Sequence, residues 1–292
     1  MALVVRNCSH EEFGTAVDWA REEGWNPGLD DLPAFFAADP NGFFMGFLDG
    51  EPVSSISVVR YGSDYGFLGF YIVAPEHRGK GIGYATWKQG MAYLEDRTVG
   101  LDGVVDQQDN YRASGFVYAG RSVRYSGVPR QMIETENVSG DGAIVQLSDD
   151  LLLELIEYDR PFFPSDRASF LTAWTQPQSN ARRRTWVCVR DNKVSGYITM
   201  RACGVGYKVG PLFADNGSIA KALLASAVET IADGAELTID VPEANGDAVA
   251  LAQHWGLQPV FETARMYRVV DPQNLPEFSL HRTHAITSFE LG

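Results

Sequence analysis

Cysteine and histidine are scarce in this 292-residue chain, which has three of the former and five of the latter. Cys8, Cys188 and Cys203 are scattered and match neither a metal site nor a disulfide framework. The histidines are equally dispersed, and none belongs to a metalloenzyme motif. We therefore expect no metal, and we expect the reducing setting of the cytoplasm.

Basic residues are also in deficit, with 24 Lys and Arg against 38 Asp and Glu, a formal charge of −14 and a pI of about 4.7. Such a charge repels nucleic acid and attracts a cationic amine, although it equally suits an ordinary acidic surface. Long apolar runs are missing too, and the first residues have no signal-peptide core. We expect neither a nucleic-acid partner nor a membrane partner.

Glycine, in contrast, is concentrated in residues 74–83, which read Ala-Pro-Glu-His-Arg-Gly-Lys-Gly-Ile-Gly. An apolar, β-rich run over 67–73 precedes this loop, and a helical pattern over 84–95 follows it. Strand, glycine loop and helix in this order predict a phosphate site, because glycines let backbone N–H groups converge at the positive end of the helix. A dinucleotide fingerprint would need glycine at Tyr84, and a P-loop would need Ser or Thr at Gly81.

Two motifs make the chain resemble the GNAT superfamily of acyl-CoA-dependent N-acetyltransferases. Arg78, Gly81 and Gly83 fit its pyrophosphate loop, which is Gln or Arg, two residues, Gly, one residue, then Gly or Ala. Tyr111 stands four residues before the pair Gly115-Phe116, as in the second family motif. The resemblance implies direct transfer of an acetyl group from acetyl-CoA to a primary amine of a small molecule or peptide. The co-substrate-binding residues it implies are Ile72, Val73, Arg78, Gly79, Lys80, Gly81, Ile82 and Gly83.

The resemblance also assigns catalytic roles. It makes Tyr111 the general acid that protonates the departing CoA thiolate. Many family members carry a basic Glu near the positions of Gly69 and Phe70, where this chain has no carboxylate. Asp106, at the end of the next strand, is our first substitute, followed by Asp64 or a water relay.

The acceptor pocket of the family is lined by the loop between the first two helices, here residues 24–28. Trp25 and Asn26 are therefore the expected substrate-binding residues, with an ordinary connector and a buried Trp as the alternative reading. A protein of another class, a non-catalytic acyl-CoA sensor or regulatory module, stays open because the strand Glu is missing.

The remaining elements expected in the first half are a strand over 3–6, a helix from Ser9 to about Glu23, a helix over 30–38, and strands over 43–48 and 52–61. Ser9 and Glu12 form a capping-box pattern, and Asp49-Gly50 is a hairpin turn. Residues 186–201 repeat the hairpin of 44–60, and Gly256-Leu257 repeats Gly115-Phe116. The nearly constant spacing between these counterparts indicates an internal duplication.

We predict an α/β (α+β) fold of two tandem GNAT-like domains, each with a mixed, mostly antiparallel sheet flanked by helices. Residues 1–127 form the catalytic domain, 128–142 a linker, and 143–292 a degenerate domain resembling an uncharacterised type found in bacterial acetyltransferases. The second copy has Asp215 in its phosphate loop and Ala252 in place of the tyrosine. Residues 278–291 are expected to add a closing strand. The two-domain mycothiol synthases resemble this layout, but their loop lies in the second copy.

Overall fold

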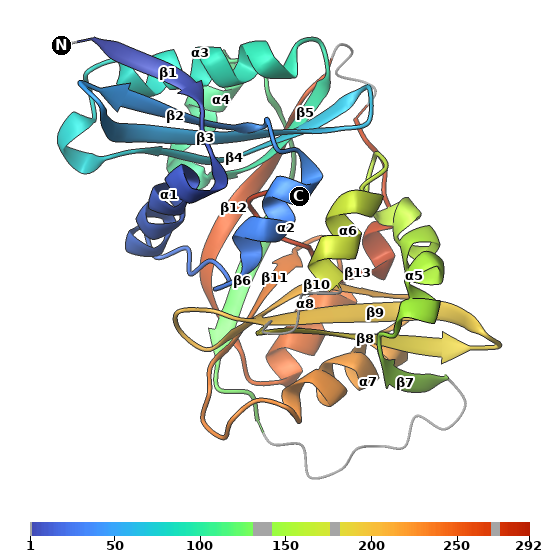
Figure 1. Cartoon of the computed structure of the whole chain (residues 1–292). Coiled ribbons are helices and arrows are strands. Elements are labelled where there is room, and N and C mark those ends of the chain that lie inside the picture. Colours follow the sequence, from blue (N-terminus) through green and yellow to red (C-terminus); the bar gives the residue numbers. More distant parts are fainter. Residues whose placement is uncertain (1, 131–141, 176–181, 270–274) are drawn as a thin grey trace.

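The computed structural model describes residues 2–130, 142–175, 182–269 and 275–292 (Figure 1). Most of the expected linker, 128–142, therefore lies outside the described residues. Within the described ranges, no helix combines the length and apolar character that crossing a membrane requires.

The chain runs twice through the same order of elements. The first half comprises β1 (Leu3–Asn7), α1 (His10–Glu22), α2 (Asp31–Ala38), β2 (Phe43–Leu48), β3 (Glu51–Tyr61), β4 (Tyr65–Val73), α3 (Ile82–Leu94), β5 (Thr98–Val104), α4 (Gln108–Ala113) and β6 (Val117–Gly127). The second comprises β7 (Ala143–Gln146), α5 (Leu152–Asp159), α6 (Ala168–Thr175), β8 (Arg183–Arg190), β9 (Lys193–Ala202), β10 (Tyr207–Ala214), α7 (Gly217–Val228), β11 (Leu237–Pro242), α8 (Gly246–His254) and β12 (Gln258–Arg268). This order confirms the predicted duplication and fold class.

Local sequence signals explain several of these elements. The Ser9 side chain accepts from the Glu12 N–H (3.2 Å), and the Glu12 carboxylate accepts from the Ser9 N–H (2.9 Å), which fixes the start of α1. The turn between β2 and β3 has positive φ at Asp49 (53°) and Gly50 (95°), and the turn between β8 and β9 repeats this at residues 191–192. Positive φ at both central residues matches the strand twist, so each hairpin closes tightly.

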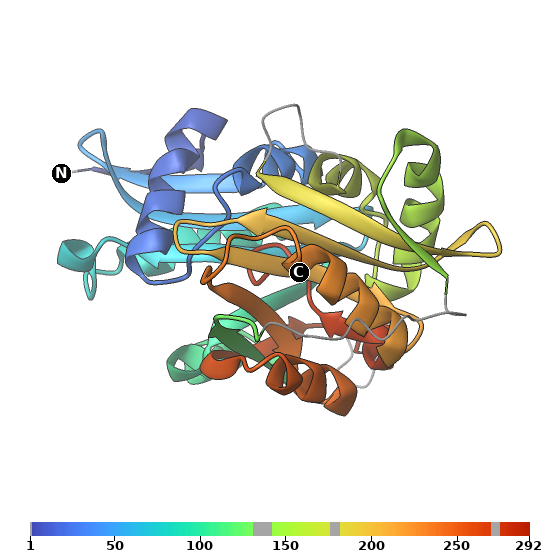
Figure 2. The same ribbon diagram turned by 90° about the horizontal axis from the view of Figure 1, so that it is seen from below.

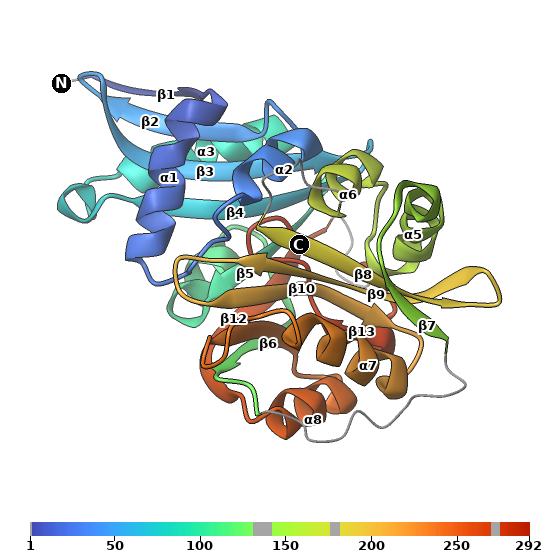
Figure 3. The same cartoon turned by 60° about the horizontal axis from the view of Figure 1, so that its bottom comes forward.

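The strands form one continuous sheet, in the order β1-β2-β3-β4-β5-β12-β6-β11-β10-β9-β8-β7 (Figure 3). The two copies exchange their last strands: β12 lies between β5 and β6, and β6 lies between β12 and β11. Each copy therefore completes the other's sheet.

The helices cover both faces of the sheet (Figures 1 and 2). In the first half α3 packs on β1 to β4 from the side opposite α1. Helices α2 and α6, from different halves, pack together, and Phe35 stacks on Trp174 with ring centroids 5.9 Å apart. This contact belongs to one buried cluster that also contains Phe13, Phe70 and Phe163, so the two halves share a hydrophobic core.

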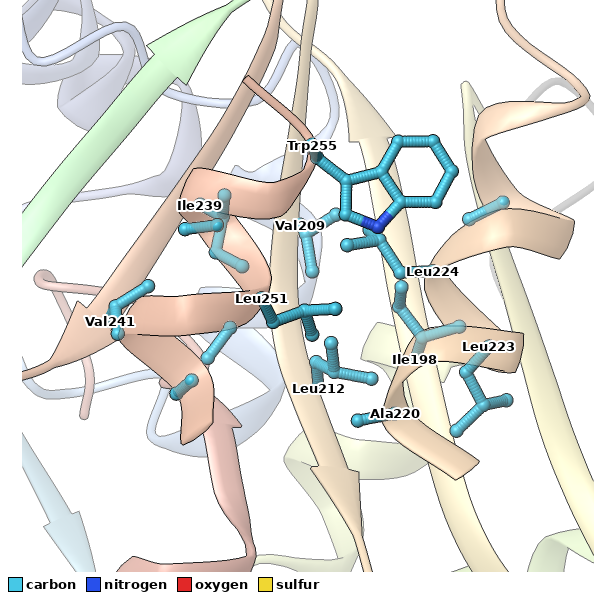
Figure 4. Packing of buried hydrophobic residues seen from close by; sticks show 14 of the residues in the cluster. Ile198, Val209, Leu212, Ala220, Leu223, Leu224, Ile239, Val241, Leu251 and Trp255 are labelled. Atoms are coloured by element: carbon cyan, nitrogen blue, oxygen red, sulfur yellow. The ribbon is translucent and has the colours of Figure 1, made fainter. Parts of the chain in front are cut away.

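A second large core consists of residues of the second half together with Val123 and Tyr125 of β6 (Figure 4). Apolar side chains of α7 and α8, among them Leu223, Leu224 and Leu251, pack against Ile198 and Val209 of the sheet. The second copy thus keeps a well-packed fold of its own.

In both copies a pair of parallel strands separates part of the way along. Strands β4 and β5 pair only from Tyr65 to Leu68, and β10 and β11 only from Tyr207 to Val209. In the second copy the gap is filled by β13 (Thr283–Ala285), which pairs with β10, while the Ile286 N–H donates to the Asp240 carbonyl (2.9 Å). We call residues 283–292 the C-terminal segment.

The C-terminal segment corrects one expectation. The closing strand predicted over 278–291 is wrong for most of its length, because Leu280–Arg282 form a 3₁₀ turn and only the three residues of β13 pair. Beyond β13 the chain leaves the sheet and reaches the first half, where the Tyr61 hydroxyl donates to the Leu291 carbonyl (3.2 Å).

We expect residues 1–127 expressed alone to aggregate or form oligomers. Without the second half, β5 loses β12, β6 loses both neighbours, and the aromatic core around Phe35 loses Trp174. Size-exclusion chromatography with light scattering, beside circular dichroism of the full chain as the control, measures this. A folded, soluble monomer with full activity would show that the second half is dispensable.

Candidate active site

A cavity of about 480 Å³ opens where β4 and β5 separate. It is lined by residues 68–73 of β4, 101–104 of β5, the glycine loop, Tyr111 of α4, and side chains of β6, β12 and the C-terminal segment. Both halves therefore enclose it.

The glycine loop presents free backbone donors to this cavity. Gly79 and Gly81 have φ of 72° and 78°, a conformation that favours glycine, and α3 starts after Gly81 without a side-chain cap. Among the described residues, no acceptor pairs with the N–H groups of residues 81–84, and the first bond of the helix is from Ala85 to the Gly81 carbonyl (3.1 Å). Unpaired N–H groups at the start of a thirteen-residue helix suit a pyrophosphate.

The third glycine has a different role. A Cβ at Gly83 would lie 2.8 Å from the Tyr71 hydroxyl and 3.0 Å from a Val73 methyl group. Glycine at this position therefore lets α3 approach β4 closely. Thr86 fixes the same helix on β3 through a hydrogen bond to Ser54 (2.7 Å).

Six of the eight residues predicted to bind the co-substrate line the cavity: Ile72, Val73, Arg78, Gly79, Gly81 and Gly83. The other two do not. Lys80 is exposed and donates to the Glu76 carbonyl (2.7 Å), and Ile82 is buried as the first residue of α3. Arg78 donates to the Val73 carbonyl (2.9 Å) and pairs with Glu23, so it fastens the loop to β4 and to the end of α1.

A bulge at Phe70 shapes the strand side of the cavity. Phe70 has φ of 44°, the β3–β4 register shifts between Ser55 and Ser57, and the Ser55 hydroxyl donates to the Phe70 carbonyl (2.8 Å). Because β5 has already separated, the edge of β4 that faced it pairs with no described strand beyond Leu68. Main-chain groups on this edge are available to a ligand.

Tyr111 borders the cavity from α4, with 8% of its surface exposed. Its ring stacks on Trp87 (centroids 5.9 Å apart) and crosses β5 at Gly103, where a Cβ would lie 2.3 Å from the ring. Burial raises the pKa of the phenol to about 12, with a smaller contribution from Tyr71. The raised pKa keeps the hydroxyl protonated near neutral pH. It has no hydrogen-bond partner among the described residues, so its proton is available to a ligand in the cavity.

The two residues predicted as general bases, Asp106 and Asp64, do not line the cavity. Asp106 is exposed on the short 3₁₀ turn after β5 (Val105–Gln107) and is not part of the cavity lining, although its neighbour Gln107 is. Asp64 precedes the other end of β4 and is also exposed. Asp102 does line the cavity, but Arg265 holds both of its oxygens (2.9 and 2.5 Å).

The loop predicted to hold the acceptor is fixed by β6 and by residues of the second half. Trp25 lines the cavity, and its carbonyl accepts from Arg124 (2.9 Å) and Lys208 (3.0 Å). Asn26 lies outside the lining and uses its amide to bond both the N–H (3.1 Å) and the carbonyl (2.8 Å) of Val205. Asn26 therefore ties the loop to the β9–β10 turn, and Trp25 faces the site.

Sequence reasoning missed the cavity residues that come from far along the chain. Arg124 of β6, Phe261 of β12, and Phe289 and Glu290 of the C-terminal segment all line it. No local pattern marks them, because the first two depend on the exchange of strands and the last two on the path of the C-terminal segment. Gly69 gives the one indirect signal, since a Cβ there would lie 2.2 Å from the Glu290 carbonyl oxygen.

The corresponding site in the second copy is closed. Asp215 pairs with Arg282 and accepts from the Tyr158 hydroxyl (3.1 Å). The Asn216 side chain caps α7 by accepting from the Ile219 N–H (2.9 Å), and β13 occupies the gap between the strands. The Asp215 carboxylate, the Asn216 cap and β13 thus occupy positions that are open in the first copy.

The first copy combines a divided parallel strand pair, a glycine loop with unpaired N–H groups and a cleft-lining tyrosine, which is the arrangement of an acyl-CoA-dependent transferase. The second copy repeats the fold and the divided strand pair, without the loop and the tyrosine. Comparison with known proteins agrees with this class. Residues 8–117 match the model of the acetyltransferase (GNAT) family, and residues 155–280 match that of a further acetyltransferase (GNAT) domain.

Among characterised relatives, a holothin acyltransferase from Pseudoalteromonas sp. (strain SANK 73390) is 34% identical over 284 residues, 97% of this chain and 92% of the relative. The chain therefore belongs to the GNAT family of acyltransferases, with two GNAT domains in tandem.

Solved structures show the same fold. A Pyrococcus horikoshii protein assigned to the acetyltransferases superposes with a TM-score of 0.79 at 21% identity, covering 99% of this chain and 96% of that one. A tandem GNAT protein from the clavulanic acid biosynthesis pathway superposes with a TM-score of 0.63 at 15% identity, covering 94% of this chain and all (100%) of that one.

Replacing Gly81 by Val should weaken acetyl-CoA binding about tenfold or more. A β-branched residue in the left-handed conformation costs roughly 1–2 kcal/mol, and relief of that strain would turn the N–H groups of the loop away. Gly120→Val, at a position where a Cβ also meets nothing within 4 Å but φ is not positive, is the matched control. Calorimetry with acetyl-CoA measures both. Equal affinity in Gly81→Val and wild type would rule out the loop as the binding site.

Proposed function

We propose that this protein moves an acetyl group from acetyl-CoA to a primary amine of a small molecule or peptide by direct transfer. The observation that carries this proposal is one cavity bordered both by the free N–H groups of the glycine loop and by the Tyr111 hydroxyl. Acyl transfer from CoA to an amine requires a site that holds the CoA phosphates and a proton donor for the departing thiolate, and this cavity has a candidate for each.

Residues of the first half would hold the co-substrate. The loop N–H groups would bind the pyrophosphate, and the unpaired edge of β4 near Ile72 and Val73 would hydrogen-bond the pantetheine and the thioester oxygen. Tyr111, kept protonated by burial, would give its proton to the sulfur as the carbon–sulfur bond breaks.

The acceptor would enter against the walls that the second half supplies. Phe261, Phe289 and Glu290 of the second half line the cavity, and Lys208 of β10 holds the Trp25 loop that borders it. We therefore infer that the second copy shapes the acceptor site and does not catalyse. We further propose that neither nucleic acid nor membrane is a partner. The three cysteines are buried and form no disulfide within the described residues, which suits a cytoplasmic enzyme.

Steady-state release of CoA from acetyl-CoA across a panel of primary amines tests the activity. The panel should include holothin, because a 34% identical relative is a holothin acyltransferase. Acetylation of at least one amine, with stoichiometric CoA, supports the proposal. Tight acetyl-CoA binding without turnover of any amine would instead support the sensor interpretation.

Replacing Tyr111 by Phe should lower kcat about 10²-fold while acetyl-CoA affinity stays within about twofold, because general acid catalysis typically contributes this much and the ring contacts remain. In wild type, the raised phenol pKa of about 12 means that Tyr111 stays protonated, so its ionisation should not reduce kcat between pH 7 and 10. Initial rates and calorimetry measure both effects. A fall in kcat smaller than about threefold would show that Tyr111 only packs.

A further inference from the structure

The C-terminal segment brings a buried carboxylate to the cavity. Glu290 is 3% exposed and belongs to the lining. Its backbone is fixed through the next residue, since the Leu291 N–H donates to the Ser288 hydroxyl (3.0 Å) and the Leu291 side chain is buried in the shared core. Gly69 allows this approach, because any side chain there would collide with the Glu290 carbonyl. The position of Glu290 is therefore set by the fold.

Three carboxylates line the cavity within the described residues, and two of them already have cationic partners. Glu23 pairs with Arg78, and Asp102 is held by Arg265 through both oxygens. Glu290 has neither an ion pair nor a hydrogen bond to its carboxylate from any residue that the structure describes. A carboxylate buried without a donor is costly, so this one is suited to a ligand that brings a donor.

The nearby cations do not neutralise Glu290 directly. Arg124 and Lys208 lie close enough to attract it electrostatically. However, Arg124 is bound through two nitrogens to Asp240 (2.6 and 2.8 Å), and Lys208 donates to the Trp25 carbonyl (3.0 Å). None of their hydrogen bonds within the described residues goes to Glu290, which leaves its oxygens for a group in the cavity.

Aromatic side chains line the same cavity as this carboxylate. The rings of Phe261 and Phe289 have centroids 6.2 Å apart, and the Arg124 guanidinium lies 4.8 Å from the Phe289 centroid. Trp25 completes the lining on the side of the α1–α2 loop. Aromatic walls beside one anionic group fit a flat, apolar body that carries an amine.

We propose that Glu290 binds the amine of an aromatic acceptor and removes its proton during acyl transfer; this rests on the proposed function. An acceptor bound as an ammonium ion first gives one proton to Glu290, which passes it to solvent. The nitrogen lone pair then attacks the thioester carbonyl carbon, and the carbon–sulfur bond breaks as the sulfur takes the Tyr111 proton. Glu290 takes a second proton from the nitrogen, and that proton returns through solvent to the Tyr111 phenolate. The products are an amide and free CoA, with both side chains restored.

Glu290→Gln tests this role, with Glu262→Gln as the matched control. Glu262 also follows an aromatic lining residue, on β12, but it pairs with Arg121 (2.9 Å) and does not line the cavity. The two probe acceptors are 2-phenylethylamine, which is an ammonium ion at neutral pH, and aniline, which is already neutral. Calorimetry on the CoA-saturated protein measures 2-phenylethylamine binding, and CoA release measures the rate with each amine.

We expect Glu290→Gln to weaken 2-phenylethylamine binding about tenfold or more, since a charged hydrogen bond is lost. Acetylation of this amine should slow by roughly 10²-fold and that of aniline clearly less, because aniline needs no proton removed before attack. Acetyl-CoA affinity should not change, Glu290→Asp should restore part of the rate, and Glu262→Gln should match wild type.

Three results would overturn the inference. Glu290→Gln could behave as wild type, it could slow both amines equally while weakening acetyl-CoA binding, or wild type could fail to bind 2-phenylethylamine. In each case, CoA release with other amines of the panel would still uphold the proposed function. Failure of the whole panel, with acetyl-CoA bound, would instead reject the activity itself.

Discussion

The exchange of final strands between the two copies is the constraint on which the rest of the structure depends. With β12 between β5 and β6, the open side of the first cleft faces a strand of the other copy, and β6 of the first copy lies beyond it. Phe261 of β12 and Arg124 of β6 line the cavity. A single GNAT domain cannot supply this wall, so the duplicated half is part of the site even though its own loop is closed.

The C-terminal segment contributes residues to both clefts. Its first residues fill the gap between β10 and β11. Beside this gap, Asp215 pairs with Arg282, and the Asn216 side chain caps the start of α7. Its last residues then reach the first cleft and place Phe289 and Glu290 there. The same ten-residue stretch therefore seals one site and helps to build the other.

The parts predictable from sequence are those governed by neighbouring residues. The capping box at Ser9, the two tight hairpins, the glycine loop before α3 and Tyr111 before Gly115-Phe116 are all local patterns, and the structure has each where it was expected. The tandem arrangement followed from repeated spacing. The role of Asp106 as base stays a prediction, although its exposed position favours it less than Glu290.

What sequence could not reveal depends on contacts between distant residues. The pairing of β12 with β5 joins positions more than 150 residues apart, such as Arg265 and Asp102, and nothing in either strand alone marks the partner. The segment 278–291 has the alternation of a strand, yet only three of its residues pair as a strand. Beyond them, burial of Leu291 in the shared core and the hydrogen bond from Tyr61 to its carbonyl draw the chain out of the sheet.

The central claim is that the chain has one open acyl-CoA cleft and that its own residues fill the other. The stoichiometry of acetyl-CoA binding to the full chain tests this claim most directly. Calorimetry at a protein concentration well above the dissociation constant measures it. We predict one molecule per chain. Two equivalent sites would contradict the closure of the second cleft by β13, and the absence of binding would contradict the assignment of the glycine loop.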